Sequence, residues 1–477
     1  MKTQMKFALS ALVLACTLGV SGCQTTNQTA SVAETTNTFA MPEYQTVTLD
    51  NGLTLKLMVK KEVPIVTFNA VIKAGAVHDT TSGLADMTAK SLMLGAGGQS
   101  KAEIEQTLDF IGAKLMTAGG TDGSYVSSNF MAKDLDKVLP IFTDVLRNPD
   151  FDADEFTKLK QRTMVGLAQQ KESPRRVIGR YFNQLVFNDH PYGNAASGFK
   201  ESIEQMTVSQ MRAFHKSYYQ PNNIQVSIVG DFDIEAMKQQ MQRAFGDWQS
   251  TEAIVANDLS KNLPSLQKSN VLLVDKPDAI ETTFLIGGMG VSQSNPDIVG
   301  LTVVNTILGG RFTSWLNDEL RVNAGLTYGA RSAFVTYADA GVFRLSTFTK
   351  TSTTKEAIDL ALKTYARLWE KGIDQATLDS AKAYVKGQFP PKFETSGQLA
   401  GLLSDQYLYG FGDEYINDFQ ARVDGVTLEE AQRLVKQYFP QDNLQYVLIG
   451  NAAEIADIAK QYGDVTQVDI TSSGFGH

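Results

Sequence analysis

The sequence contains little cysteine and no long apolar segment beyond its N-terminus. Its 477 residues include two cysteines, Cys16 and Cys23, and both lie within the first residues of the chain. The rest of the chain therefore has no thiol for a disulfide or for a thiolate zinc site. No later apolar run is long enough to cross a membrane. The net charge of −9 argues against a nucleic-acid partner, which would require a basic face.

Histidine is also scarce. The four histidines are His78, His190, His215 and His477, and no two of them are four residues apart. A lone histidine is more often packed or hydrogen-bonded than bound to a metal. His78 is the one candidate ligand near a predicted helix that begins with Ser82 as its N-cap.

The N-terminus has the pattern of a bacterial lipoprotein signal. Two lysines precede an apolar run from Phe7 to Val20, and residues 20–23 read VSGC. We expect removal of residues 1–22 and lipid attachment to the sulfur of Cys23; an ordinary signal peptide with a chance cysteine is the alternative. Gln24, in place of an aspartate, favours the outer membrane, facing the periplasm. Small polar residues then predict a flexible tether at 23–44.

The remaining chain contains an internal duplication. Residues 203–231 resemble residues 423–451 at an offset of 220. Each copy has the pattern of a helix, a polar turn and an apolar strand. A repeat of this length indicates a duplicated domain. The matched pairs include Thr207 with Thr427, Asn223 with Asn443, Gln225 with Gln445 and Gly230 with Gly450.

The starts of the two copies also correspond. Residues 54–75 and 270–290 each contain two predicted strands separated by a break at a proline. The predicted fold class is α+β, with two duplicated domains, each a mostly antiparallel sheet with helices on one face. The predicted boundaries are 45–248 for the N-terminal domain, 249–268 for a polar linker, 269–467 for the C-terminal domain and 468–477 for a disordered tail.

Five segments carry a resemblance to a known family. They read DNGLTLKLMVKKEVPIVTFNAVIKAGA near the start, HPYGNAASG at 190–198, YYQPNNIQVSIVGD at 218–231, NTILGGRFTSWLNDELRVNAGLTYGARS at 305–332 and ETSGQLAGLLSDQYLYG at 394–410. Together they resemble the pitrilysin/insulinase family of zinc metallopeptidases (inverzincins), in the bacterial branch similar to mitochondrial processing peptidase. The resemblance covers residues 45–460. It implies that the two domains are arranged around a central chamber.

Active members of this family carry H-x-x-E-H on a helix that follows Gly-Leu-Ala. The two histidines bind zinc, and the glutamate acts as general base on the zinc-bound water. In this sequence Gly83-Leu84-Ala85 is followed by Asp86 in place of the first histidine, Ala89 in place of the glutamate and Lys90 in place of the second histidine. The resemblance therefore implies a degenerate zinc site at Asp86, Ala89 and Lys90.

The family pattern includes a further glutamate, about 75 residues beyond the helix. It would fall near Gly166 or Leu167, in a segment without an acidic residue between Arg162 and Lys171. No metal and no other cofactor is therefore expected in this chain, and no residue is assigned as catalytic.

Asp86 and Lys90 are four residues apart, in the order that favours an ion pair on a helix. One hypothesis is that the lysine ammonium partly fills the electrostatic role of the missing metal. The alternative is a solvated surface pair, and Lys90 pointing into bulk solvent would exclude the first hypothesis.

The second half of the sequence matches the family at a different functional position. NDELRVNAGLTYG at 317–329 has Arg321 seven residues before Tyr328, as in the family's Arg…Gly-Leu-x-Tyr pattern. In the family this pair holds substrate backbone and helps stabilise the oxyanion. A guanidinium and a phenol are suitable fixed donors for this purpose. The structural alternative is that Arg321 pairs with Asp318 or Glu319 at a helix end and that Tyr328 lies in the core or on the surface of a strand.

The resemblance implies a division of labour between two chains. Bacterial members often pair a zinc-bearing chain with one that carries only the Arg/Tyr pair, and this sequence is of the second kind. The leading prediction is a non-catalytic, substrate-binding subunit of a heterodimeric periplasmic zinc metallopeptidase, with zinc in the homologous partner, a peptide substrate and contact with the membrane through the lipid anchor only. A non-enzymatic scaffold or peptide-binding lipoprotein is the second reading. A standalone peptidase with an unusual metal site is the third.

Overall fold

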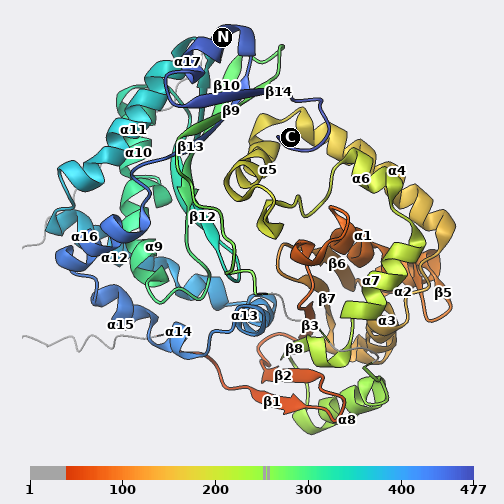
Figure 1. The fold of residues 1–477 in the computed structure, drawn as a ribbon. Coiled ribbons are helices and arrows are strands. Elements are labelled where there is room, and N and C mark those ends of the chain that lie inside the picture. Colours follow the sequence, from red (N-terminus) through yellow and green to blue (C-terminus); the bar gives the residue numbers. More distant parts are fainter. Residues whose placement is uncertain (1–38, 251–253, 255–257, 477) are drawn as a thin grey trace, which may run out of the picture. The chain divides into compact units, whose positions relative to one another are not determined.

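Two six-stranded sheets dominate the structure, a computed structural model that describes residues 39–250, 254 and 258–476 (Figure 1). We refer to residues 39–248 and 269–476 as the N-terminal half and the C-terminal half. The predicted signal peptide, Cys23, most of the tether, part of the linker and His477 lie outside the described residues. Within the described ranges, no helix is both long and apolar enough to span a bilayer.

The sheet of the N-terminal half has the order β1-β2-β8-β3-β7-β6. Its neighbouring strands are antiparallel except for the parallel pair β2 and β8. The strands are β1 (Gln45–Thr48), β2 (Thr54–Val59), β3 (Ile65–Ile72), β6 (Lys114–Gly119), β7 (Ser124–Met131) and β8 (Ile224–Gly230), and a separate short pair is β4 (Gly95–Ala96) with β5 (Gln99–Ser100).

The sheet of the C-terminal half has the order β11-β12-β10-β13-β9-β14. Read from β14, this is the order of the first sheet, with β14 in the place of β1 and β13 in the place of β8. The strand β14 is parallel to β9, whereas β1 is antiparallel to β2. The strands are β9 (Asn270–Asp275), β10 (Glu281–Met289), β11 (Arg331–Thr336), β12 (Gly341–Lys350), β13 (Gln445–Gly450) and β14 (Asp464–Asp469).

The repeated sequence forms the same local structure twice. Thr207 caps α7 by accepting a hydrogen bond from the N–H of Gln210, and Thr427 caps α16 by accepting one from Glu430. Each helix leads into the strand that the repeat predicts, β8 or β13. The prediction of two duplicated α+β units with mostly antiparallel sheets is therefore confirmed.

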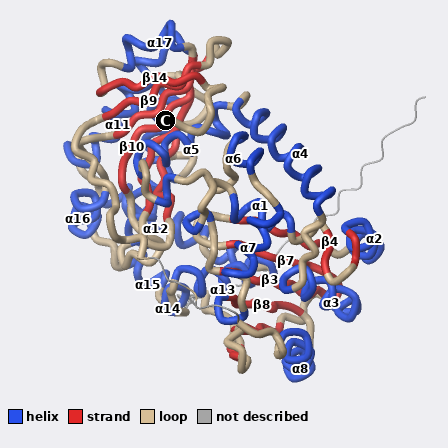
Figure 2. The backbone as a smooth tube through the Cα atoms, turned by 45° about the vertical axis from the view of Figure 1, so that its right-hand side comes forward, coloured by secondary structure: helices blue, strands red, loops and turns tan. Residues whose placement is uncertain are grey.

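Helices of the N-terminal half cover one face of its sheet (Figure 2). The core between them contains Phe68, Phe130 and Phe142, whose rings pack edge to face. This half contains η1 (Ala76–His78), α1 (Leu84–Ser91), α2 (Lys101–Ile111), η2 (Ala132–Asp134), α3 (Leu135–Arg147), α4 (Ala153–Lys171), α5 (Pro174–Phe187), η3 (Pro191–Gly193), α6 (Lys200–Gln205), α7 (Val208–Tyr218), η4 (Pro221–Asn223) and α8 (Ile234–Phe245).

Helices of the C-terminal half cover the corresponding face of the second sheet, over a core that includes Phe284, Phe343 and Phe439. This half contains α9 (Ile298–Asn305), η5 (Thr306–Gly310), α10 (Trp315–Asn317), η6 (Asp318–Asn323), η7 (Thr351–Thr353), α11 (Thr354–Glu370), α12 (Gln375–Gln388), η8 (Pro390–Phe393), α13 (Ser396–Tyr409), α14 (Glu414–Asn417), α15 (Phe419–Asp424), α16 (Leu428–Tyr438) and α17 (Ala452–Ala459).

The second face of each sheet carries one helix from the other half. The helix α5 packs on β10 and β13 of the C-terminal sheet, in a cluster that includes Val177 and Leu285. The helix α13 packs on β3 and β8 of the N-terminal sheet, where the side-chain amide of Gln225 donates to the Leu403 carbonyl at 2.7 Å. The sequence predicted helices on one face of each sheet, and the structure adds one helix on the second face. It also joins the predicted domains into one contact unit, Phe39–His477.

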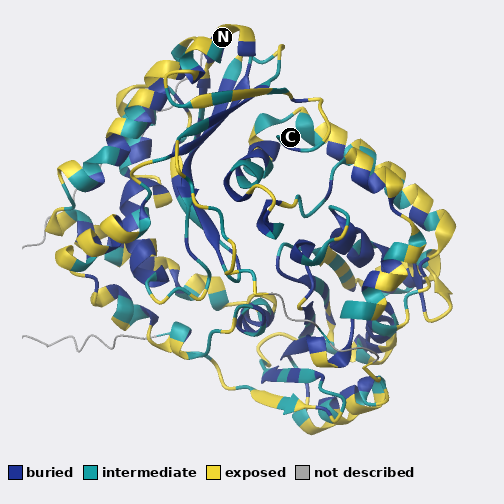
Figure 3. Cartoon of the chain, in the orientation of Figure 1, coloured by how far each residue is buried: buried dark blue, intermediate teal, exposed yellow. Residues whose placement is uncertain are grey.

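The exchange explains the apolar strands of the repeat. All seven residues of β8 and all six of β13 are buried, since both strands are covered on both faces (Figure 3). A strand covered on one face alone would alternate between apolar and polar residues. β13 has the unbroken apolar run 447–449, which matches the two-sided covering. β8 alternates instead, and its Gln225 and Ser227 are buried because they find polar partners on α13, the Leu403 carbonyl and the Ser404 hydroxyl.

The C-terminal tail differs from the prediction of disorder at residues 468–477. Residues up to Asp469 complete β14, and Phe475 is buried against α5 with its ring centroid 5.2 Å from that of Tyr181. The Lys171 ammonium lies 5.4 Å above the Phe475 ring. The small polar residues around this phenylalanine suggested disorder, but one large aromatic ring is enough to anchor the segment to a neighbouring helix.

Candidate functional site

The helix α1 presents the positions where the family carries its zinc motif. It begins after Gly83, whose φ of 91° is left-handed. The Asp79 carboxylate caps the helix by accepting hydrogen bonds from the N–H groups of Gly83 and Ala85, at 2.8 and 2.7 Å. The prediction of Ser82 as the cap is wrong, because the Ser82 hydroxyl donates instead to the Ala195 carbonyl at 3.1 Å.

The start of α1 holds two titratable groups in an apolar setting. Burial raises the pKa of Asp79 to about 7, although its hydrogen bonds from backbone N–H groups act in the opposite direction. Burial also lowers the pKa of His78, whose Nδ1 has no hydrogen-bond partner and whose ring centroid lies 5.0 Å from that of Tyr218. His78 is therefore packed against an aromatic ring, which is the environment of a structural histidine.

Asp86 and Lys90 form an ion pair on α1. Lys90 Nζ lies 2.6 Å from Asp86 Oδ2, and the side chains are 37% and 7% exposed, respectively. The backbone N–H of Gly119 donates to Asp86 Oδ1 at 3.3 Å. Lys90 therefore directs its ammonium at a buried carboxylate and not into bulk solvent. The hypothesis that this ammonium partly replaces the charge of the missing metal is thus not excluded. Ala89 is fully buried.

The residues at the metal positions do not fit zinc. One carboxylate already bonded to an ammonium, a methyl group and the ammonium itself offer too few ligands for a tetrahedral site. On α4, Leu167 is packed in the core and Gly166 has no ligating side chain. Among the residues that the structure describes, no three His, Cys, Asp or Glu side chains are grouped so as to hold a metal ion.

The other described histidines are hydrogen-bonded to backbone. His190 Nε2 lies 3.1 Å from the Leu259 carbonyl oxygen. His215 Nε2 lies 3.0 Å from the Leu146 carbonyl oxygen, and burial lowers the pKa of His215 to about 4. These contacts agree with the expectation that a lone histidine is packed or hydrogen-bonded.

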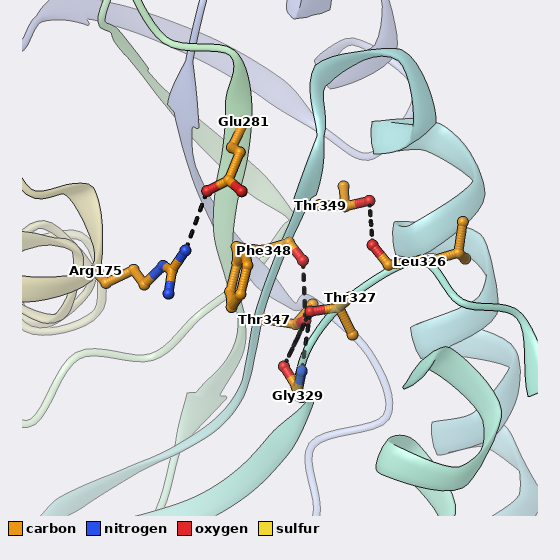
Figure 4. Close-up of polar contacts among 8 residues, drawn as sticks. All are labelled: Arg175, Glu281, Leu326, Thr327, Gly329, Thr347, Phe348 and Thr349. Atoms are coloured by element: carbon orange, nitrogen blue, oxygen red, sulfur yellow. Dashed lines mark hydrogen bonds and ion pairs between the residues drawn. The ribbon is translucent and has the colours of Figure 1, made fainter. Parts of the chain in front are cut away.

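The segment that precedes β11 is attached to β12 through threonine side chains (Figure 4). The Thr349 hydroxyl donates to the Leu326 carbonyl at 2.8 Å. The Thr347 hydroxyl lies 3.0 Å from Thr327 Oγ1 and 2.9 Å from the Gly329 carbonyl oxygen. The backbone ladder between β11 and β12 begins only at Arg331, so these hydroxyls take over its role for the preceding residues.

Tyr328 projects from this segment and is 84% exposed. Arg321, in η6, directs its guanidinium over the ring of Phe312 at 4.6 Å. The predicted ion pair with Glu319 is not formed, because Glu319 pairs with Arg367 at 3.1 Å, and Tyr328 lies at the surface and not in the core. The structure thus leaves both side chains accessible to a ligand, and it shows no hydrogen bond between them among the described residues.

Tyr328 lines a pocket of about 390 Å³ between α5 and the C-terminal sheet. Arg175, from α5, lies across this pocket with its guanidinium carbon 3.4 Å from the centroid of the Phe348 ring. Its Nη2 donates to Glu281 Oε2 at 3.1 Å (Figure 4).

Sequence reasoning missed the Arg175 and threonine contacts. The alternation of threonines in TFTKT at 347–351 was an available signal for the attachment of the segment before β11. Nothing in the sequence around Arg175 points to a strand more than a hundred residues away.

Comparison with known proteins gives the family. The model of the insulinase family (peptidase family M16) matches residues 57–198, and the model of the peptidase M16 inactive domain matches residues 205–385. The protein is 24% identical to the zinc protease PqqE of Helicobacter pylori over 408 residues, which cover 84% of this chain and 91% of that protein. It is 23% identical to the non-peptidase homolog YmxG of the same organism over 380 residues, covering 79% and 87%.

Solved structures agree with this assignment. The crystal structure of a peptidase M16 inactive domain from Pseudomonas fluorescens has a TM-score of 0.80 at 23% identity and covers 86% of this chain and 98% of that chain. A protease from Helicobacter pylori has a TM-score of 0.78 at 22% identity, with coverage of 86% and 100%. The chain belongs to the insulinase family of peptidases, family M16, and its sequence contains no H-x-x-E-H.

Proposed function

We propose that this protein is the non-catalytic, substrate-binding subunit of a heterodimeric zinc metallopeptidase that acts on peptides. A homologous partner would supply the zinc, the general base and the attacking water. This chain would supply Arg321 and Tyr328. The observation that carries the proposal is the contrast within one chain: the metal positions hold a carboxylate, a methyl group and an ammonium, whereas Tyr328 is exposed on a segment fastened by threonines.

The physical role of the pair is to donate hydrogen bonds. The phenol of Tyr328 and the guanidinium of Arg321 are donors that remain free of any carboxylate among the described residues. Donors held toward a carbonyl oxygen stabilise the negative charge that develops when water attacks it. An extended peptide could use the same donors for its backbone while its own N–H and C=O groups pair with a sheet edge.

A non-enzymatic scaffold is the second candidate, and one observation favours it. Phe312 and Val322 are exposed apolar residues beside Arg321, whose guanidinium rests on the Phe312 ring. Such a surface could bind another protein rather than a peptide substrate. The scaffold would use this surface without any need for the Tyr328 hydroxyl.

The decisive experiment is reconstitution. The soluble body, residues 24–477, is combined with the zinc-motif homologue encoded in the same genome, and peptide cleavage is measured for each chain alone and for the mixture. Activity that requires both chains and is lost in Arg321→Ala/Tyr328→Phe supports the substrate-binding subunit. An active partner that gains nothing on mixing supports the scaffold.

We further propose that the chain is a lipoprotein of the outer membrane, facing the periplasm. The VSGC pattern that ends at Cys23 supports this location. Membrane fractionation of cells that express wild type or Cys23→Ser tests it. Wild type should fractionate with the outer membrane, and the variant should be released into the periplasmic fraction. Wild-type protein in the soluble fraction would contradict the anchor.

A further inference from the structure

The pocket beside Tyr328 carries positive charge in a protein whose net charge is −9. Its lining includes Arg175 from α5 and Arg331 from β11, together with the uncharged side chains of Ser346 and Thr347. A concave surface of one sign in a protein of the opposite net sign is a feature of ligand sites, because the walls focus the local potential.

The side chain of Arg331 has no hydrogen bond or ion pair with any residue that the structure describes, and it is exposed. It is paired in register with Ser346, and side chains of directly paired residues point to the same face of a sheet. This is the face that α5 covers, because Leu285, which is paired with Ser346, belongs to the apolar cluster under α5. The guanidinium of Arg331 is therefore available at the pocket.

Arg344 adds a second unpaired cation on the same face, two residues from Ser346 along β12. It is half-buried and has no hydrogen bond or ion pair with a described residue, and burial lowers its pKa. Its Nη1 lies 3.0 Å from the position that a Cβ on Gly179 would take, so the guanidinium packs closely against α5 at this glycine. Arg344 is not a pocket-lining residue, but its charge adds to the potential there.

The nearby carboxylates do not neutralise these cations. Glu281 is paired with Arg175. Glu172 and Asp278 both pair with Lys276, at 3.2 and 2.7 Å. The charges of Arg331 and Arg344 therefore remain without a carboxylate partner among the described residues.

We propose that this pocket binds a carboxylate of the peptide held at Tyr328, with Arg331 as its principal partner. Arg175 provides the opposite wall, held flat on the Phe348 ring by its bond to Glu281. The inference rests on the proposed function and narrows the substrate class to peptides with an acidic side chain, or a free C-terminus, near the residue that Tyr328 contacts. Arg331 is a specificity residue in this scheme and takes no part in bond cleavage.

The test measures peptide binding rather than cleavage. Fluorescent peptides that differ only in Glu or Gln at one position, each with a free or an amidated C-terminus, are titrated by anisotropy against the soluble body, alone and with the zinc-bearing homologue. We expect the carboxylate to strengthen binding by about tenfold at low salt, as for one solvent-accessible charge-assisted hydrogen bond. Added salt should reduce the difference.

Variants separate the pocket from the rest of the site. Arg331→Gln should abolish the preference for the carboxylate and leave the binding of the neutral peptide unchanged. Arg176→Gln is the matched control, because Arg176 is an exposed arginine on α5 outside the pocket lining, and it should keep the preference. Tyr328→Phe should weaken the binding of acidic and of neutral peptides by the same factor.

Each outcome decides one point. Tighter binding of the peptides with Glu, or of the peptides with a free C-terminus, supports the proposed carboxylate site. Which of the two peptide sets binds more tightly identifies the source of the carboxylate. Equal binding of all peptides, with dependence on Tyr328 retained, overturns the pocket and leaves the proposed function intact. Failure of every peptide to bind, with or without the homologue, overturns both.

Discussion

The helix α1 and the segment before β11 are the two regions that the family resemblance marks as functional positions, and they differ in what they expose. On α1 the positions that correspond to the zinc motif are buried or paired: Ala89 is fully buried, and the Asp86 carboxylate forms an ion pair with Lys90. Before β11 the side chain of Tyr328 is turned outward and its backbone is fastened. Residues that serve only the fold can be buried and paired, whereas a residue kept for a ligand must stay accessible and fixed.

The largest effect should come from Tyr328. In the reconstituted heterodimer, Tyr328→Phe should lower kcat/KM by about 100- to 1,000-fold, the usual effect of removing one oxyanion donor. The fold should be unaffected, because the hydroxyl makes no hydrogen bond with a described residue. The measurement is steady-state cleavage with circular dichroism as the folding check.

Asp86→Asn on α1 is the variant to compare with Tyr328→Phe. It removes the charge at a former ligand position, and we expect activity within about twofold of wild type if α1 has no role in catalysis. A loss comparable to that of Tyr328→Phe would reverse the contrast between the two regions.

Lys90→Met should have the next largest effect, this time on stability. The substitution leaves the buried Asp86 carboxylate with one long hydrogen bond from Gly119, which should cost about 1–3 kcal/mol of unfolding free energy. Denaturant titration measures it. The double variant Asp86→Asn/Lys90→Met should recover most of the loss. An unchanged midpoint for Lys90→Met would support the reading of a solvated surface pair.

Thr347→Val tests how the segment before β11 is held. It removes the hydroxyl that bonds Thr327 and Gly329, and should cost about 1 kcal/mol of stability and raise the KM of the heterodimer by several-fold, because Tyr328 loses its support. Thr364→Val is the control, since the buried Thr364 hydroxyl bonds only the Leu360 carbonyl on α11. It should reduce stability without changing KM; equal KM changes in both variants would remove the special role of Thr347.

The last prediction concerns the pH dependence of α1. The pKa of Asp79 is raised from its ordinary value of 3.8 to about 7 in the folded state. Its contribution to stability is therefore complete below about pH 4 and is lost as the pH rises to about 7. Asp79→Asn should flatten this part of the profile of unfolding free energy by up to roughly 1 kcal/mol per pH unit. The buried Asp122, with its pKa raised to about 6, should leave a residual slope. A profile identical to wild type would show that Asp79 does not titrate there.

Much of the site was readable from the residues alone. The order Asp86, Ala89, Lys90 after Gly-Leu-Ala is a local pattern, and so is Arg321 before Tyr328. The cap of α1 was not predictable, because Asp79 reaches the helix N-terminus from outside the usual N-cap position. The order of the tail likewise depends on Phe475 finding Tyr181 on a distant helix.

The sequence by itself determined the family, the duplication, the two α+β halves and the absence of an H-x-x-E-H motif, because each of these follows from residue identity and local periodicity. Only the tertiary structure decided that α5 covers the C-terminal sheet and α13 covers the N-terminal sheet. Because of this exchange, Arg175 of α5 and Tyr328 line one pocket. The physical reason is that residue identity and local periodicity do not specify which distant helix covers the second face of a sheet, since that depends on which helix can reach it.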